Sequence, residues 1–169
     1  SVIEDWIQEE TMRSIENNRG IAPGDLRMRT DLADWLLYAS KEIVRADDQF
    51  GDEYSVEKQK LIQIIDILRV RVQHGCKEEL LQLVSLKGIG RKRARDLSDF
   101  GVSNPLNILE LSERDKERLI KRVGWGKKLV QNIIEQVKNI SKNSESVIKS
   151  KLGNKRKDDE PLPGEKKGD

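Results

Sequence analysis

The sequence has few residues that could cross-link the chain or build a large hydrophobic core. Its single cysteine, Cys76, excludes an internal disulfide, and aromatic side chains make up only 4% of the residues. Charged side chains reach 37%, a balance that favours a helical protein with much solvated surface over a thick β core. No apolar run approaches membrane-spanning length, and the first residues do not have the pattern of a signal peptide. We therefore expect a soluble, cytoplasmic protein without a membrane partner.

Motifs for nucleotide hydrolysis are also missing. The chain has neither a phosphate loop of the type GxxxxGK[ST] nor an acidic DExH motif for Mg²⁺. His74 is the only histidine, which excludes a Ser/His/Asp set, and His74 with Cys76 makes too few ligands for zinc. We predict no catalytic residue, no metal site and no cofactor in this chain.

Charge is distributed unevenly along the chain. Residues 1–57 carry 14 acidic and 6 basic side chains, a net charge of −8, whereas the whole chain has +2. The remaining residues therefore carry +10. This split predicts that the second half meets a polyanion while the first half packs or faces elsewhere.

Apolar periodicity and turn residues predict an all-α fold. Residues 1–18 have helical spacing without a preceding cap segment, which suggests a piece of a larger protein. A helix capped by Asp25 should run to about Ala46, and one from Ser55 should end at Gly75. The latter is apolar on most sides, so we expect it to be the central buried helix.

The second half should contain shorter helices and a tail. We expect helices at residues 77–84, 91–100 and 127–140, one after the Asn104-Pro105 pair, and one capped by Ser112 with Asp115. From residue 141 the chain is almost devoid of apolar side chains, which predicts a disordered basic tail. The expected domains are 1–75, 76–140 and 141–169.

A glycine turn precedes the densest basic run. Apolar residues flank Gly88 and Gly90 in the helix-hairpin-helix pattern, and Ile89 between the two glycines should anchor the turn in the core. Both glycines should allow backbone angles forbidden to other residues and let a phosphate approach the following helix N-terminus. The predicted DNA-binding residues are Lys87, Gly88, Ile89, Gly90, Arg91, Lys92, Arg93 and Arg95. The alternative is a helix cap beside a merely solvated basic face.

Helix geometry ranks the arginines of this run. Arg91 and Arg95 should share one face beside the positive end of the helix, while Arg93 points about 160° away from each. We therefore expect the outer two to contribute more to DNA binding than Arg93. A second turn around Gly124 and Gly126 has similar spacing and adds Lys127 and Lys128 as candidate contacts, although its Trp125 is compatible with a core role alone.

Two stretches together resemble a known family. "RVQHGCKEELLQLVSLKGIGRKRARDLSDFGVSN" and "GDLRMRTDLADWLLYA" are similar to the C-terminal end of the archaeal HelQ/Hjm family of Ski-two-like superfamily-two DNA repair helicases. The resemblance implies the end of a helical ratchet domain, residues 1–75, followed by a small DNA-binding domain. It implies contact with single-stranded DNA behind an ATP-dependent 3′–5′ motor, and restraint of translocation. ATP, Mg²⁺ and the motor domains would then belong to the rest of the parent protein.

The same resemblance implies site residues on the ratchet helix. Trp35 stands at the position that stacks on a base, and Arg27 matches the first backbone-binding arginine. The family usually has a second arginine directly afterwards, whereas this chain has Met28 and then Arg29, which puts the second contact in doubt. Expected partners are single-stranded or forked DNA, the missing helicase domains and, through the tail, replication-fork proteins.

Other interpretations remain open at this point. Trp35 lies at the edge of an apolar stripe, so periodicity alone favours a core role. A DNA glycosylase/lyase would use Lys92 with an acid about eighteen residues later, where this chain has Glu110. A structural adaptor would use the basic hairpin to dock an acidic protein partner.

Overall fold

The chain folds into helices joined by short turns. The computed structural model describes the backbone of residues 1–46 and 54–155, and the side chains up to residue 143. No strand occurs in these ranges, so the all-α prediction is confirmed. Two compact units are present, Ser1–Pro105 and Leu106–Asp169. The domain boundary expected after residue 75 stays a prediction. None of the described helices combines the length and apolarity needed to cross a bilayer.

The opening helix expected over residues 1–18 is in fact two helices, α1 (Val2–Ile7) and α2 (Met12–Arg19). Ser1 caps α1 through a capping box with Glu4, so the expectation of an uncapped start is wrong. The side chain of Thr11 accepts a hydrogen bond from the Ser14 N–H and starts α2 afresh. Apolar side chains on both helices still face one core, which is why periodicity alone missed the break. That core comprises Ile15, Ile21 and Leu26, with Val2, Trp6 and Met12 packed against it.

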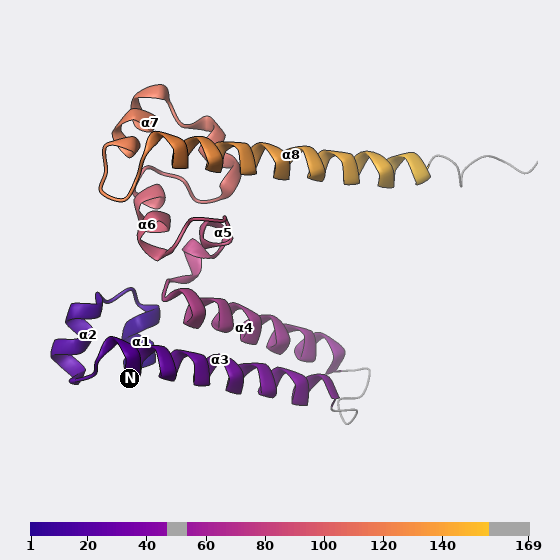
Figure 1. Cartoon of the computed structure of the whole chain (residues 1–169). Coiled ribbons are helices and arrows are strands. Elements are labelled where there is room, and N and C mark those ends of the chain that lie inside the picture. The colour runs from indigo at the N-terminus through magenta and orange to yellow at the C-terminus, as the bar shows by residue number, and fades with distance from the viewer. Residues whose placement is uncertain (47–53, 156–169) are drawn as a thin grey trace, which may run out of the picture. The chain divides into compact units, whose positions relative to one another are not determined.

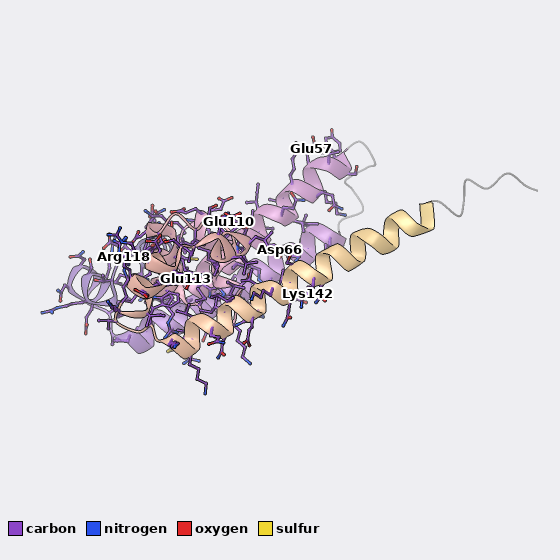
Figure 2. The ribbon with its side chains drawn as sticks, turned by 90° about the horizontal axis from the view of Figure 1, so that it is seen from above. Glu57, Asp66, Glu110, Glu113, Arg118 and Lys142 are labelled. Atoms are coloured by element: carbon purple, nitrogen blue, oxygen red, sulfur yellow. The ribbon has the colours of Figure 1, made fainter. Side chains whose placement is uncertain are left out.

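Helices α3 (Pro23–Ala46) and α4 (Ser55–His74) lie side by side as an antiparallel pair (Figure 1). Arg69 on α4 donates two hydrogen bonds to the Asp34 carboxylate on α3, at 2.8 and 3.2 Å. Lys41 pairs with Asp66, part-way along α4 (Figure 2). These cross-helix ion pairs fix which side of α3 faces α4. Residues 47–53, where a turn was expected, lie outside the described residues.

Helix α4 is not the central buried helix that its apolar sequence predicted. Only Ile65 and Val72 on it are buried, while Leu61 and Ile64 are 40% and 59% exposed. Among the described elements of its unit, α4 packs mainly on α3 and contacts α1 and α5, which leaves one side uncovered. Its predicted end is confirmed: Gly75 caps the helix in the left-handed conformation, with φ of 62°.

The remaining elements are short except for the last. A 3₁₀ turn, η2 (Glu78–Leu80), leads into α5 (Leu81–Val84), and α6 (Arg91–Asp99) follows the first glycine turn. The second unit contains η3 (Pro105–Glu110), which begins at the last residue of the first unit, α7 (Glu113–Ile120) and α8 (Lys127–Lys155).

Helix α8 continues past its expected end near Ile140 to Lys155. The residues from Ser141 to Leu152 include no proline or glycine, so nothing in this stretch stops a helix. The rest of the expected tail, residues 156–169, lies outside the described residues. The predicted cap of α7 is confirmed, since the Ser112 side chain accepts a hydrogen bond from the Asp115 N–H at 3.1 Å.

Candidate nucleic-acid interface

The first glycine turn joins α5 to α6. Gly88 has φ of 88°, a left-handed conformation that side chains disfavour, so glycine is required there. The Ile89 N–H donates to the Leu86 carbonyl at 3.0 Å and the Ala94 N–H donates to the Gly90 carbonyl at 2.9 Å. Ile89 and Ala94 are buried, as the hairpin pattern predicted. The buried apolar side chains of the turn therefore anchor it in the core.

Gly90 serves the turn differently from Gly88. Its φ of −95° and ψ of 178° are open to any residue, so the expectation that both glycines need special backbone angles is wrong for Gly90. A Cβ at this position would meet nothing within 4 Å, and no side chain caps the start of α6. The helix N-terminus consequently faces open space across a residue without a side chain, the arrangement that a phosphate needs for close approach.

The second glycine turn, between α7 and α8, repeats the backbone of the first. Gly124 has φ of 86°, the Trp125 N–H donates to the Arg122 carbonyl at 3.1 Å, and the Val130 N–H donates to the Gly126 carbonyl at 3.0 Å. A Cβ at Gly126 would also meet nothing within 4 Å. Trp125 is half-buried in the place of Ile89. The second hairpin predicted from glycine spacing is thus present.

Exposed lysines follow both glycine turns, and Lys92 and Lys128 stand at corresponding places. Lys92 is exposed on the first turn of α6, and Lys127 and Lys128 are exposed on the first turn of α8. Lys87 is exposed within the first turn itself. Arg93 is half-buried, and its Nη1 donates to the Gly88 carbonyl at 2.7 Å. Arg93 therefore braces the glycine turn.

Arg91 is held by the protein rather than presented to solvent. Its guanidinium stacks on the Trp6 ring, 4.0 Å from the centroid. Nη1 donates to the Glu10 carbonyl at 3.2 Å and, more weakly, lies 3.5 Å from the Gly75 carbonyl. The Trp6 Nε1–H in turn donates to the Val72 carbonyl at 2.8 Å. Burial lowers the pKa of Arg91 from its usual value, although an arginine stays charged.

Arg95 is paired on the same side. Its guanidinium donates to both carboxylate oxygens of Glu9, at 2.8 and 2.6 Å, and to Glu79 at 2.8 Å. Glu9 also accepts the Lys77 N–H at 3.0 Å. Arg91 and Arg95 do share one face of α6, as predicted, but that face packs against the α1–α2 connection. The sequence could not show this cover, because Glu9 lies 86 residues before Arg95.

Glu9, which pairs with Arg95, has an unusual backbone conformation. Its φ of 71° makes it the one non-glycine residue in the described part of the chain with positive φ. Such a conformation costs about 1–3 kcal/mol and persists only where other contacts hold it. Burial raises the pKa of the Glu9 carboxyl, but hydrogen bonds from Arg95 and the Lys77 N–H outweigh burial and leave the pKa below its usual 4.5. Sequence reasoning missed both Glu9 and Trp6.

Helix α3 presents the other candidate residues. Trp35 is 61% exposed, so it is not part of the core, and the core alternative is wrong for this chain. Arg27 and Arg29 are exposed, and in the part of the chain that the structure describes neither forms an ion pair. Met28, which replaces the expected arginine, is 72% exposed. These side chains are all accessible to a ligand.

The enzymatic alternative gains nothing from the structure. A lyase lysine must lose its charge in a desolvated setting before it can attack, whereas Lys92 is exposed. Glu110 is exposed too, and its Oε2 accepts a hydrogen bond from Asn107 at 3.0 Å. Burial raises the pKa of the Cys76 thiol to about 11, which leaves it protonated and a poor metal ligand.

Residues 1–75 match the model of domain 4 of archaeal helicases, and residues 79–139 match the SAM-like helix-hairpin-helix tandem. Proteins named ATP-dependent DNA helicase Hel308 are similar over most of the chain. That of Thermoplasma acidophilum is 31% identical over 140 residues, and that of Thermococcus kodakarensis is 36% identical over 132.

The chain belongs to this family of archaeal helicases. The matches cover 83% and 78% of this chain but only 19% and 11% of those two relatives. The resemblance to the C-terminal part of an archaeal superfamily-two helicase is confirmed, and with it a helix-hairpin-helix DNA-binding fold. Which residues touch DNA stays a prediction.

Proposed function

We propose that this chain binds the phosphate backbone of single-stranded or forked DNA, without reading base sequence, as the part of a helicase that contacts the strand behind the motor. The observation that carries the proposal is the repeated glycine turn. In both turns a helix N-terminus faces open space, with exposed lysines on the first turn of the helix. Contacts of this kind go to phosphates and carry little sequence information.

Helix α3 would supply a second kind of contact. The exposed indole of Trp35 offers a flat apolar surface on which a base can stack, and such stacking tolerates any base. Arg27 lies on the same helix, two turns before Trp35, and is available to follow the backbone of the same strand, whereas Arg29 points about 160° away from Arg27. Met28 carries no charge, so α3 would hold this strand through Arg27 and Trp35, with Arg29 on another side of the helix.

In the parent helicase, we propose that grip on the emerging strand restrains translocation. The motor domains would supply ATP and Mg²⁺ chemistry, since this chain contains neither of the phosphate-binding motifs. A grip that must be broken at each step slows movement without taking part in hydrolysis. We also propose a cytoplasmic location, and replication-fork proteins as partners of the tail, residues 141–169, of which residues 156–169 lie outside the described residues.

Salt dependence of single-strand binding tests the proposal. Each phosphate neutralised adds roughly 0.7 to the log–log slope for single strands, so four or five contacts predict a slope of about −3 to −4. A labelled oligonucleotide titrated into the 169-residue chain at several salt concentrations between about 50 and 200 mM, roughly a fourfold range, measures that slope. Two unrelated sequences should bind equally.

Two outcomes would overturn it. Binding that is absent at low salt removes the DNA proposal altogether. Flat salt dependence would favour the adaptor alternative, in which the basic hairpin docks a protein. ATP hydrolysis by the same preparation, measured in parallel, should not exceed a blank, and turnover that survives repurification would contradict the assignment of hydrolysis to other domains.

A further inference from the structure

Two arginines of the hairpin are neutralised by the protein itself. We name the cluster of Trp6, Glu9, Glu79, Arg91 and Arg95 the arginine latch. It joins α6 to α1, to the α1–α2 connection and to η2 within one compact unit. Its two arginines and two glutamates sum to zero charge, so the latch offers a phosphate no net attraction.

Burial argues that the latch persists when DNA binds. The Glu9 side chain is only 16% exposed, and that of Arg95 is 35% exposed. A phosphate that displaced Glu9 from Arg95 would leave a mostly buried carboxylate beside a second negative group. The Glu9 side chain also cannot move away without releasing the Lys77 N–H. Arg91 is similarly committed, since its guanidinium covers the Trp6 ring.

We propose that Glu9 and Trp6 are positioning residues that hold α6 and its glycine turn in place through Arg95 and Arg91, and that these two arginines do not themselves contact DNA. Only the statement that the two arginines do not contact DNA rests on the proposed function. Phosphates would then be met at the open N-terminus of α6, with Lys87 and Lys92 as exposed cations. This reverses the ranking predicted from helix geometry, in which Arg91 and Arg95 were the main contacts.

A double-mutant cycle separates positioning from contact. Glu9→Gln, Arg95→Gln and their combination each remove the ion pair while keeping a polar side chain, and Lys92→Gln is the matched control on the same helix. Each latch variant should lower the melting temperature by a few degrees. Arg95→Gln also removes the pair with Glu79, so the double variant should melt close to Arg95→Gln rather than at the sum of the two single effects. Lys92→Gln should leave melting unchanged.

The salt dependence of DNA affinity distinguishes contact from positioning, because a purely structural change would leave its log–log slope unchanged. Arg95→Gln should keep the wild-type slope and weaken affinity no more than Glu9→Gln does. Lys92→Gln should reduce the slope by roughly 0.7. If Arg95→Gln also reduces the slope by that amount while Glu9→Gln does not, Arg95 contacts phosphate and the proposal is overturned.

Spectroscopy gives a separate reading for Trp6. In a Trp35→Phe, Trp125→Phe background, Arg91→Gln should change the Trp6 emission, whereas adding DNA should not. A change on adding DNA would mean that the latch opens, which contradicts the proposal. If the chain binds no DNA at all, the proposed function fails, yet additive melting effects in the cycle would still reject the latch and non-additive ones would support it.

Discussion

The indole of Trp6 covers Gly75 so closely that a Cβ at residue 75 would lie 2.2 Å from Trp6 Cε2. Trp6 cannot simply move aside, because its ring is held by Val72 and Arg91. Gly75→Ala must also adopt a left-handed φ of 62°. We expect a loss of roughly 1–2 kcal/mol from the backbone and about 1–3 kcal/mol from overpacking, measured by chemical denaturation.

Gly20 provides the matched control for that substitution. It has the same φ of 62° at the end of α2, but a Cβ there would meet nothing within 4 Å. Gly20→Ala should therefore lose only the backbone part, about 1–2 kcal/mol. Equal losses for the two variants would show that the Trp6–Gly75 contact is not tight.

Trp35→Ala should separate binding from folding. Because the side chain is 61% exposed, its removal should change the free energy of unfolding by less than about 0.5 kcal/mol. Single-strand affinity should fall by about 1–3 kcal/mol if the indole stacks on a base. Ile43→Ala, 70% exposed on the same helix, should change neither quantity. A large drop in melting temperature for Trp35→Ala would restore the core interpretation.

The two glycines of the first turn should respond in opposite ways. Gly88→Ala places a side chain at φ of 88° and should destabilise the unit by about 1–2 kcal/mol. Gly90→Val, with ordinary backbone angles and open space around it, should leave stability nearly unchanged while weakening DNA binding. Denaturation and titration of both variants test this. Unchanged affinity for Gly90→Val would mean that phosphate does not approach the start of α6.

Acid should weaken two contacts by a common route. The pKa of Glu9 lies below its usual 4.5 for the reasons given above. The pKa of Asp34 lies below its usual 3.8, chiefly because Arg69 donates hydrogen bonds to its carboxylate. A carboxyl with a lowered folded pKa contributes stability that is complete above its unfolded pKa and is lost as pH falls through the folded pKa. The melting temperature should thus decline as pH drops below about 4.5, and less steeply in Glu9→Gln and in Asp34→Asn. Equal slopes in wild type and variants would contradict these pairings.

Local signals predicted much of this fold from the sequence. Gly75 follows the last apolar position of α4, where a left-handed cap is the usual end of a helix, and the structure places it there. The spacing around Gly88 and Gly124 predicted both hairpins, because a turn that requires positive φ leaves a glycine at a fixed offset from its apolar anchors. Ser112 predicted the start of α7, because serine is a common N-cap residue. Each of these signals acts within a few residues.

Features that depend on distant partners could not be predicted in this way. Periodicity showed that Arg91 and Arg95 share a face, but nothing in α6 shows that Glu9 and Trp6 cover it. The apolar sequence of α4 implied burial on all sides, whereas the exposure of Ile64 depends on which elements lie around it. The break between α1 and α2 had a local sign in Thr11, a good N-cap, which the continuous apolar spacing concealed.

The Arg95–Glu9 pair has a consequence for the order of folding. It joins residues 86 positions apart, whereas the first glycine turn is closed by hydrogen bonds between neighbours such as Ile89 and Leu86. Closing a long loop costs chain entropy before any contact repays it, so the hairpin can assemble early and dock onto the N-terminal helices late. Contacts formed after the rate-limiting step mainly slow unfolding. The Arg95–Glu9 pair, formed late, would then lengthen the lifetime of the assembled unit more than it speeds the assembly.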